Sequence, residues 1–424
     1  MRYQSMVVFA SLIAYTSATL ETAANGFNIR QGAPTRTLSP CAQVSVLLSD
    51  RNSSKPVPST VPADIAYECL RSMPLNVTSA KKVLFQLPLY LNWQSTLDVL
   101  KKPPAEYVEK VQAPVDILAG LDVIYSAIDS GDITSEWDFG WSLYQLLGSA
   151  HDGHLNYILD VVGAVFQFHR PLPLVSVSED GNKLPAVFAY EDVLGSQFGN
   201  ITYTPSPIVK IDNTDVNMYL EDLSQEGTLQ DRDALYNNLF FSLAQVSLGS
   251  VGSATGMFTG GGRARFVPLG ANTTLQFANG SVSIIQNFAR TYIDFSNVSS
   301  GEDLRKKIVY IESSPSASRR PNRIDPVSNV SGEDDIPDTA AATPAGYPVP
   351  ITTGPSNVIN GYYLDDPGYE DVAILAVSSF LTNYGAETAF QAAGKKFLEK
   401  AWGDGKKKLI IDVQANGGGT ILLG

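Results

Sequence analysis

The chain has 424 residues, and 44% of them are hydrophobic, which is enough to bury the cores of two or three domains and excludes a disordered protein. Its formal net charge is -13, and its basic residues cluster only at Arg305–Lys307 and Lys406–Lys408. Such a surface repels a phosphate backbone, so nucleic acid is excluded as an expected partner. We also expect no cofactor.

The first 18 residues have the pattern of a secretory signal peptide. Arg2 precedes an apolar stretch from Met6 to Tyr15, and Thr16-Ser17-Ala18 is a suitable small-residue cleavage site. The apolar stretch is shorter than the roughly 20 residues that cross a bilayer, so no membrane span is expected. We therefore predict a secreted protein. The alternative is that residues 1–18 form the first helix of the fold.

Seven N-x-S/T sequons agree with secretion and predict a glycoprotein. The sequons begin at Asn52, Asn76, Asn200, Asn272, Asn279, Asn297 and Asn329. The only two cysteines are Cys41 and Cys69. In an oxidising compartment they are expected to pair, and the closed loop would stabilise the fold by about 3 to 4 kcal/mol in the chain-entropy model. The alternative is two unpaired, buried thiols.

Residues 19–170 are predicted to form a helical domain. Ser39-Pro40 and Val61-Pro62 are expected to open helices, because proline is favoured at the first helical position. Three further helices are predicted, over Trp93–Lys102 with a stop at Pro103-Pro104, over Val115–Ile128 and over Ser135–Leu147.

Residues 171–312 consist of short β-branched and aromatic runs, which are typical of strands. Strands are expected within Leu184–Tyr190 and Pro207–Ile211. Asn279-Gly280, between TTLQFA and SVSIIQ, predicts a hairpin in which both turn residues have positive φ. Residues 313–356 lack apolar periodicity and are predicted to be a flexible loop or linker. Within it, Arg319-Arg320 is either a dibasic processing site or a solvated pair.

Residues 357–424 are predicted to begin an α/β domain. Val372–Val377 and Leu409–Val413 are expected to be buried, parallel strands that flank a helix over Ala386–Trp402, and the apolar run at Leu409 is typical of a strand covered by helices on both faces. Gly417–Gly419 then forms a sharp turn. Thr420 is a plausible N-cap, but Ile421–Leu423 supply only about one helical turn, so we expect the chain to stop in mid-fold.

Two of the three histidines, His151 and His154, lie close together in GSAHDGHL. The H-x-x-H spacing could bind a metal, but no further ligand follows at a recognisable spacing, so no metal site is expected. The glycine-rich segment Gly249–Gly262 contains neither nucleotide-binding motif of the P-loop or Rossmann type, which disfavours a nucleotide enzyme.

Asp152-Gly153-His154-Leu155, followed much later by a strand that ends in D-V-x-x-N-G-G-G, resembles the S41 serine peptidases. The similarity is greatest to the branch related to chlamydial protease-like activity factor, as found in secreted fungal proteins. Four segments carry the resemblance, namely Trp93–Thr96 with Lys102–Pro104, Ala150–His154, Leu174–Ser178 with Asp180-Gly181, and Ile411–Gly419.

The resemblance implies an α+β multidomain fold with a helical N-terminal domain, a PDZ-like β-rich module and the first part of an α/β catalytic core. Pro207–Ser224 resembles part of the PDZ-like module, with a strand, a polar turn at Asp212-Asn213 and a helix that begins near Val216. Such a module can hold a peptide end or an added strand through backbone groups.

By the same resemblance, His154 would be the general base that takes the proton of a serine nucleophile, a role that suits a histidine. The backbone N–H groups of Gly418 and Gly419 would form the oxyanion hole. The family's serine and the acidic residue that orients its histidine follow the N-x-G-G turn, beyond Gly424. Ser378 and Ser379 do not occupy the position of that serine.

We therefore expect a serine endopeptidase of the secretory pathway that processes secreted or precursor peptides, such as those of a peptide-derived secondary metabolite. The 424-residue chain alone is expected to be inactive. Two alternatives remain. One is a secreted pseudopeptidase that binds peptides without cleaving them, and the other is one part of a split enzyme whose second chain supplies the missing catalytic half.

Overall fold

The computed structural model describes residues 38–49, 59–246, 255–309, 343, 347–364, 366–382, 386–414 and 416–420. Ser39–Gly424 forms one compact unit, and Leu38 belongs to the separate unit Met1–Leu38. Several predictions fall outside the described residues, namely the signal peptide, the sequons at Asn52 and Asn329, the Arg319-Arg320 pair and the apolar residues Ile421–Leu423.

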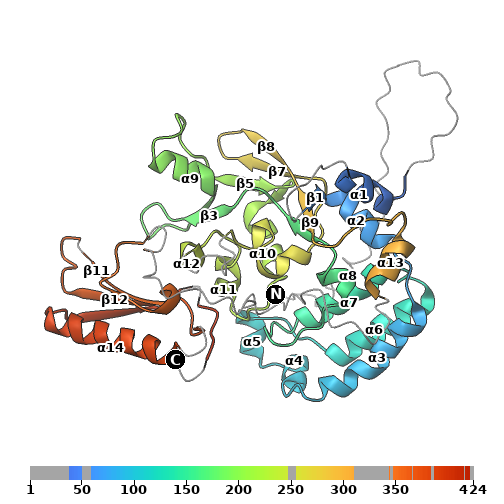
Figure 1. Cartoon of the computed structure of the whole chain (residues 1–424), viewed down its shortest axis with the longest axis horizontal. Helices are drawn as coiled ribbons and strands as arrows, with labels where there is room; N and C mark the ends of the chain where they lie inside the picture. Colours follow the sequence, from blue (N-terminus) through green and yellow to red (C-terminus); the bar gives the residue numbers. More distant parts are fainter. Residues whose placement is uncertain are drawn as a thin grey trace, which may run out of the picture. The chain divides into compact units, whose positions relative to one another are not determined.

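The first part of the larger unit is mainly helical, as predicted (Figure 1). Its helices are α1 (Pro40–Ser49), α2 (Ala63–Arg71), α3 (Val77–Leu91), α4 (Leu97–Lys101), α5 (Ala105–Lys110), α6 (Ile117–Ser130), α7 (Glu136–Gly148) and α8 (Asp160–Gly163). Among the described residues, no helix is both long enough and apolar enough to cross a bilayer.

Helices α6 and α7 confirm the predictions made for Val115–Ile128 and Ser135–Leu147. The side chain of Asp116 caps α6, and the hydroxyl of Ser135 caps α7 by accepting the N–H of Asp138 at 2.9 Å. Gly131, with φ 82°, ends α6 in the left-handed conformation that glycine adopts without strain. The two helices bury apolar faces against α3 in one cluster.

The prediction of a helix over Trp93–Lys102 is wrong in its first half. Helix α3 extends to Leu91 because Leu84, Leu87 and Leu91 recur on its buried face. The chain then turns, and only Leu97–Lys101 is helical. Trp93 lies in the turn with 90% of its surface exposed, so this segment lacked the buried face that would hold a longer helix.

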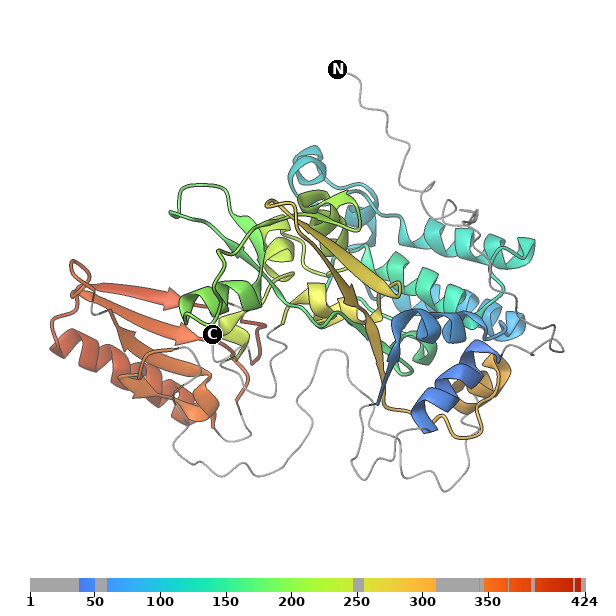
Figure 2. The same cartoon turned by 90° about the horizontal axis from the view of Figure 1, so that it is seen from above.

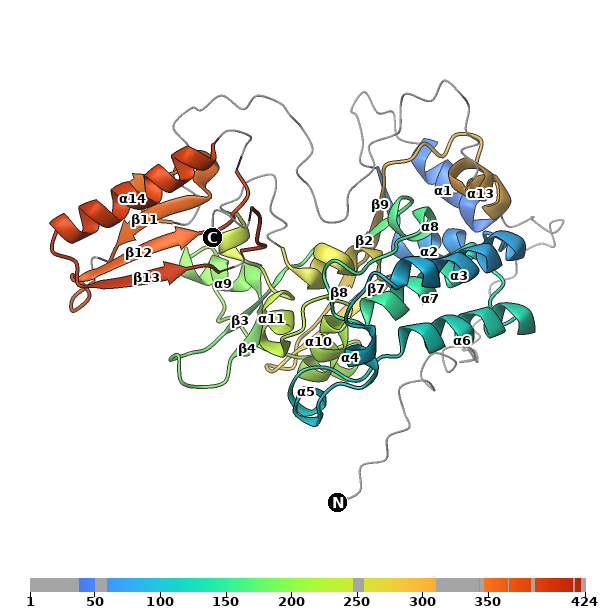
Figure 3. The same ribbon diagram turned by 90° about the horizontal axis from the view of Figure 1, so that it is seen from below.

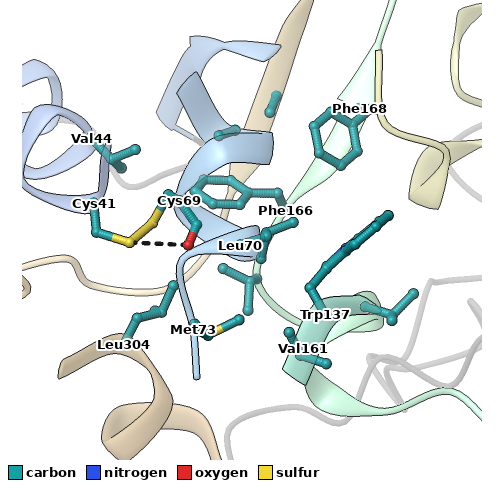
Figure 4. Packing of buried hydrophobic residues seen from close by; sticks show 14 of the residues in the cluster. Cys41, Val44, Cys69, Leu70, Met73, Trp137, Val161, Phe166, Phe168 and Leu304 are labelled. Atoms are coloured by element: carbon teal, nitrogen blue, oxygen red, sulfur yellow. Dashed lines mark hydrogen bonds between the residues drawn. A yellow bond between two sulfur atoms is a disulfide. The ribbon is translucent and has the colours of Figure 1, made fainter. Parts of the chain in front are cut away.

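Cys41 of α1 and Cys69 of α2 form a disulfide, with Cα atoms 4.6 Å apart. The bond lies in a cluster of buried side chains that joins α1 and α2 to α7 (Figure 4). Its members include Val44, Leu70, Met73, Trp137, Val161, Phe166, Phe168 and Leu304. Because the disulfide lies within the apolar core, α1 and α2 are held together both by a covalent bond and by buried apolar contacts.

The β-rich region follows, with sheets in the strand orders β3-β4 and β6-β5-β7-β8. Its strands and helices are β2 (Gln167–His169), β3 (Leu174–Val177), β4 (Ala186–Ala189), α9 (Tyr190–Gln197), β5 (Ile208–Ile211), β6 (Thr214–Asp215), α10 (Val216–Ser224), α11 (Arg232–Asn237), α12 (Leu243–Val246), η2 (Met257–Thr259), η3 (Gly262–Phe266), β7 (Asn272–Phe277), β8 (Val282–Gln286) and β9 (Phe288–Thr291). The predicted strand and helix within Pro207–Ser224 are present as β5 and α10, and the predicted turn at Asp212-Asn213 lies between β5 and β6.

The β7–β8 hairpin is present as predicted, but its turn is of another type. Only Gly280 has a positive φ, at 85°, and Asn279 does not. The N–H groups of Phe277 and Gly280 bond to Ser281 and Phe277, which defines a longer loop with a single left-handed residue. Two adjacent positive φ angles occur instead at Asp212 and Asn213, between β5 and β6.

After the hairpin the chain returns to the helical part. Strand β9 pairs with β1 (Ser59–Pro62) on one side and β2 on the other. Helix α13 (Gly301–Val309) packs beside α1, and Figures 2 and 3 show the two helices next to each other. The sequence assigned this segment to the β-rich region. Its apolar residues, including Phe295 and Leu304, find their buried partners in the helical core instead.

The last described part is a sheet in the order β10-β11-β12-β13. Its elements are β10 (Thr352–Thr353), η4 (Pro355–Asn357), β11 (Ile359–Tyr363), β12 (Val372–Val377), α14 (Glu387–Gly403) and β13 (Lys408–Asp412). The predicted β-α-β unit is confirmed, with β12 and β13 parallel. Residues 352–357, assigned by sequence to the linker or its end, belong to this sheet because Thr352 and Thr353 pair with β11.

The prediction that both parallel strands are buried is wrong for β13. Helix α14 lies along one face of the sheet (Figures 1 and 3). Strand β13 lies at the sheet edge, where Leu409, Ile410 and Ile411 are 45%, 48% and 62% exposed. Within the described residues, one helix cannot cover both faces of this strand.

Candidate active site

The predicted general base, His154, lies on a short loop after α7. We call residues 149–155 the histidine loop. The side chain of His154 is 95% exposed. By contrast, the ring Nδ1 atoms of His151 and His169 lie 3.0 and 3.1 Å from the carbonyl oxygens of Leu229 and Thr259. Of the three histidines, His154 is therefore the one whose ring is accessible to a substrate in the described structure.

Asp152 fixes the backbone on which His154 is carried. Its Oδ1 accepts the backbone N–H of His154 at 2.9 Å, and its Oδ2 accepts the side-chain amide of Gln94 at 3.0 Å. These hydrogen bonds, the one from His154 first, lower the pKa of Asp152, so it stays ionised at neutral pH. Asp152 Oδ1 is 3.8 Å from His154 Nδ1, too far for a hydrogen bond that would orient the ring.

His151 has a different environment from that of its neighbour in the motif. It is 6% exposed, and burial lowers its pKa, while hydrogen bonds with Leu229, Gly227 and Gln225 oppose that shift. The described residues contain no group of three side chains suited to hold a metal. The H-x-x-H motif is thus divided between an anchored ring and an exposed one.

The second predicted part of the site is the glycine turn, residues 416–420. Gly418 and Gly419 have φ angles of 93° and 140°. A Cβ on Gly419 would lie 2.3 Å from the carbonyl carbon of Phe380, so only glycine fits there. Hydrogen bonds run from Phe380 N–H to Gly418 O and from Thr420 N–H to Phe380 O, both 2.9 Å, and hold the turn against the segment after β12.

The two proposed oxyanion donors are not equivalent. The N–H of Gly418 donates to the side chain of Asn416 at 2.7 Å, and the amide of Asn416 donates in turn to Val377 O at 2.9 Å. The N–H of Gly419 takes part in no hydrogen bond among the described residues. The N–H of Gly418 therefore closes the turn, whereas that of Gly419 does not.

The described residues do not join the two halves of the predicted site. No hydrogen bond links His154 to the glycine turn. Ser378 Oγ lies 3.4 Å from the carbonyl oxygens of Asn357 and Val358, and Ser379 Oγ accepts the N–H of Leu381. Among the described residues, neither serine forms a hydrogen bond with a histidine. The roles of His154, Gly418 and Gly419 remain predictions.

Sequence reasoning missed several residues that shape the site. Gln94 and Asn416 stand within the motifs that carry the family resemblance, yet only the structure shows what their amides bind. No motif or pattern in the sequence pointed to Glu226. Burial raises its pKa to about 7, and a hydrogen bond with Gln145 of α7 opposes the shift.

The glycine-rich segment has a packing role in its described part. A Cβ on Gly256 or Gly260 would lie 2.4 or 2.1 Å from the carbonyl oxygens of Leu239 and Phe168, respectively. These glycines allow close backbone contact within the fold.

Comparison with known proteins shows which proteins the chain is similar to. Residues 167–296 match a family model described as CPAF-like PDZ domain. Peptidase S41 family protein phomP1' of Diaporthe leptostromiformis is 29% identical over 342 residues, which are 78% of this chain and 48% of that protein. Peptidase S41 family protein ustP of Aspergillus flavus is 33% identical over 193 residues, 45% of this chain and 38% of that protein.

Among solved structures, "Structure of mature CPAF complexed with lactacystin" matches with a TM-score of 0.39 and 13% identity, covering 81% of this chain and 58% of that one. The chain spans about half the length of the curated relatives phomP1' and phomP1. The matched residues 167–296 overlap the region 171–312, which was expected to contain the PDZ-like module. By these comparisons, the chain is similar to proteins named as peptidase S41 family proteins, and its residues 167–296 match a CPAF-like PDZ domain.

Proposed function

We propose that this chain contributes the general base and part of the oxyanion hole of a serine endopeptidase. The observation that carries the proposal is the contrast among the three histidines. His151 and His169 are bound to carbonyl oxygens, whereas His154 is exposed on a loop whose backbone is fixed by Asp152. A fixed backbone with a free imidazole is what proton transfer to and from a bound substrate requires.

Gly419 supports the same reaction. Gly419 is an exposed residue, and a backbone N–H at this position can stabilise the negative charge that develops on the carbonyl oxygen of a cleaved peptide bond. The turn is held by hydrogen bonds with Phe380, so this donor is positioned before a substrate arrives. The serine nucleophile and the acidic residue of the family lie outside the motifs matched in this chain, so the complete reaction is a proposal for the protein in its natural, assembled form.

The catalytic test uses the protein expressed from its own transcript and a serine-directed fluorophosphonate together with a peptide substrate library. Replacing His154 by glutamine should reduce labelling and cleavage by at least about 10³-fold, because the nucleophile loses its base. Lys183→Ala, an exposed position paired only with Glu179, is the matched control. Full labelling of His154→Gln would contradict the proposal. Peptide binding without any labelling of the native protein would favour the pseudopeptidase.

We further propose that the protein acts in the secretory pathway on secreted or precursor peptides, including those of a peptide-derived secondary metabolite. The Cys41–Cys69 disulfide supports an oxidising compartment. The sequon residues Asn200, Asn272, Asn279 and Asn297 are exposed and open to glycosylation. Asn76 is different because it is only partly exposed at the start of α3, where its side chain accepts the N–H of Ser79 at 3.1 Å.

Localisation is tested by recovering the protein from culture medium and treating it with an endoglycosidase. We expect a mobility shift, with glycans mapped to the four exposed asparagines and lower occupancy at Asn76. Recovery only inside cells, without glycans, would contradict secretion while leaving the peptidase proposal intact. The substrate class is tested by comparing secreted peptides with and without the gene, and an unchanged peptide profile would contradict it.

A further inference from the structure

The histidine loop is attached to two different parts of the molecule. On one side, Gln94, which follows α3, donates its amide to Asp152 at 3.0 Å. On the other side, the ring of His151 contacts the carbonyl of Leu229 at 3.0 Å. Leu229 belongs to residues 225–231, here called the 225–231 loop, which connects α10 to α11 in the CPAF-like PDZ domain.

The geometry of His151 shows that this second attachment is specific. A carbonyl oxygen can only accept, so His151 Nδ1 carries the proton in this hydrogen bond. The backbone of His151 has φ 48°, a conformation that is uncommon for a residue with a side chain and persists only when the surroundings enforce it. The burial of the ring and its contacts with the 225–231 loop supply that enforcement.

The 225–231 loop is itself anchored to the helical part at several points. The buried side chain of Gln112 donates to Gln230 O at 3.1 Å. Arg232, the first residue of α11, donates to Val111 O at 3.0 Å. A hydrogen bond also joins Glu226 to Gln145 of α7. A displacement of α10 or α11 would therefore act on the histidine loop, and His151 provides the direct contact.

We propose that His151 is a positioning residue through which the CPAF-like PDZ domain sets the placement of His154. His154 lies three positions after His151 and two after Asp152, so the two attachments define the path of the short backbone segment that carries the base. This inference rests on the proposed role of His154.

The test uses the full chain labelled with ¹³C at histidine Cε1, which contributes three imidazole signals. His151→Phe keeps a ring in the buried site but removes the donor, whereas His151→Asn retains an N–H near the position of Nδ1. In the Phe variant we expect the His154 signal to shift or broaden. We also expect amide hydrogen exchange in 149–155 and 225–231 to rise roughly 3- to 10-fold, the range expected for one lost hydrogen bond. The Asn variant should restore most of both effects.

Exchange in α3 and α6 serves as the control for global folding and should not change. Equal behaviour of the Phe and Asn variants, or unchanged exchange in 225–231, would overturn the proposal. Should the Phe variant unfold, Arg232→Gln provides a second test at an exposed residue that does not touch His151. Faster amide hydrogen exchange in residues 149–155 of Arg232→Gln would then support a coupling between the 225–231 loop and the histidine loop. Unchanged exchange would refute it. None of these measurements depends on catalytic activity. A failed peptidase assay would therefore contradict the proposed function without deciding whether His151 positions the loop.

Discussion

The two parts of the molecule that carry predicted catalytic groups are built in different ways. The helical and PDZ-like part, residues 39–309, holds the histidine loop by side chains, namely Gln94, Asp152 and His151. The C-terminal sheet, residues 347–420, holds the glycine turn by backbone hydrogen bonds and by the absence of a Cβ at Gly419.

The cores behind the two parts also differ. The first part has large apolar clusters and a disulfide within one of them. The described C-terminal sheet has two small clusters against α14, and the apolar residues of β13 are exposed. The comparison teaches that the loop carrying the predicted base depends on contacts with distant residues, whereas the glycine turn depends on local backbone geometry. Four changes test this contrast, from the largest expected effect to the smallest.

Of these four changes, removal of the disulfide should have the largest effect, and that effect should fall on the first part. Replacing Cys41 and Cys69 together by alanine is expected to lower the free energy of unfolding by about 3 kcal/mol, because the unfolded chain loses its closed loop. Thermal or urea unfolding followed by region-resolved hydrogen exchange measures the effect. Loss of protection in α14 and β12 before α1 and α2 would contradict the assignment of this stability to the first part.

Gly419→Ala should have the next largest effect, confined to the C-terminal sheet. The added Cβ would meet backbone atoms of Phe380 and Leu381 at 2.3 to 2.6 Å, and φ is 140°. We expect a loss of about 2 kcal/mol or more from strain. The matched control is Gly417→Ala, where a Cβ meets nothing within 4 Å. Equal stability of the two variants in urea unfolding would show that the turn does not depend on this contact.

The burial of Glu226 predicts that the contact between α7 and the 225–231 loop depends on pH. Its pKa is raised from 4.5 to about 7 by burial, so the native state holds a proton that the unfolded state releases in this range. Stability from this group is therefore fully present below about pH 4.5 and is lost as the pH rises to 7. The shift corresponds to at most about 3 kcal/mol, and for a partly buried residue we expect roughly 1 to 2.

The measurement is the free energy of unfolding at several pH values for the native chain and for Glu226→Gln, which mimics the protonated carboxyl. The slope between pH 4.5 and 7 should be smaller in the variant. Glu221→Gln, at an exposed position of α10, is the control and should leave the slope unchanged. An identical slope in Glu226→Gln would mean that this carboxyl is hydrated in solution.

Ile411→Lys should have the smallest effect. Ile411 is 62% exposed on β13, so replacing it should change the free energy of unfolding of this chain by less than about 0.5 kcal/mol. Phe397→Ala, in the fully buried contact of α14 with the sheet, should instead cost about 3 to 5 kcal/mol. A large loss of unfolding free energy in Ile411→Lys would show that β13 is covered in solution. The C-terminal sheet would then not differ from the first part in the exposure of its apolar residues.

Much of the local structure was predictable because local chemistry determines it. Helices α6 and α7 have apolar faces at helical spacing and begin at the capping residues Asp116 and Ser135. The turn at Asp212 and Asn213, the helix starting at Val216 and the parallel pair of β12 and β13 were expected from short patterns. The hairpin at Gly280 was expected, but its turn type depended on how many residues the flanking strands left unpaired.

Contacts between distant residues were decided only by the tertiary structure. His151 and Leu229 are 78 residues apart, and their contact divides two similar histidines into an anchor and a candidate base. Likewise β9 and α13 return to the helical core. The exposure of β13 depends on which elements cover it rather than on its apolar composition. The sequence by itself determined elements, turns and family motifs, since these depend on near neighbours. Burial and hydrogen-bond partners depend on contacts throughout the folded chain. Only the tertiary structure therefore showed which motif residues are buried and bonded and which are exposed.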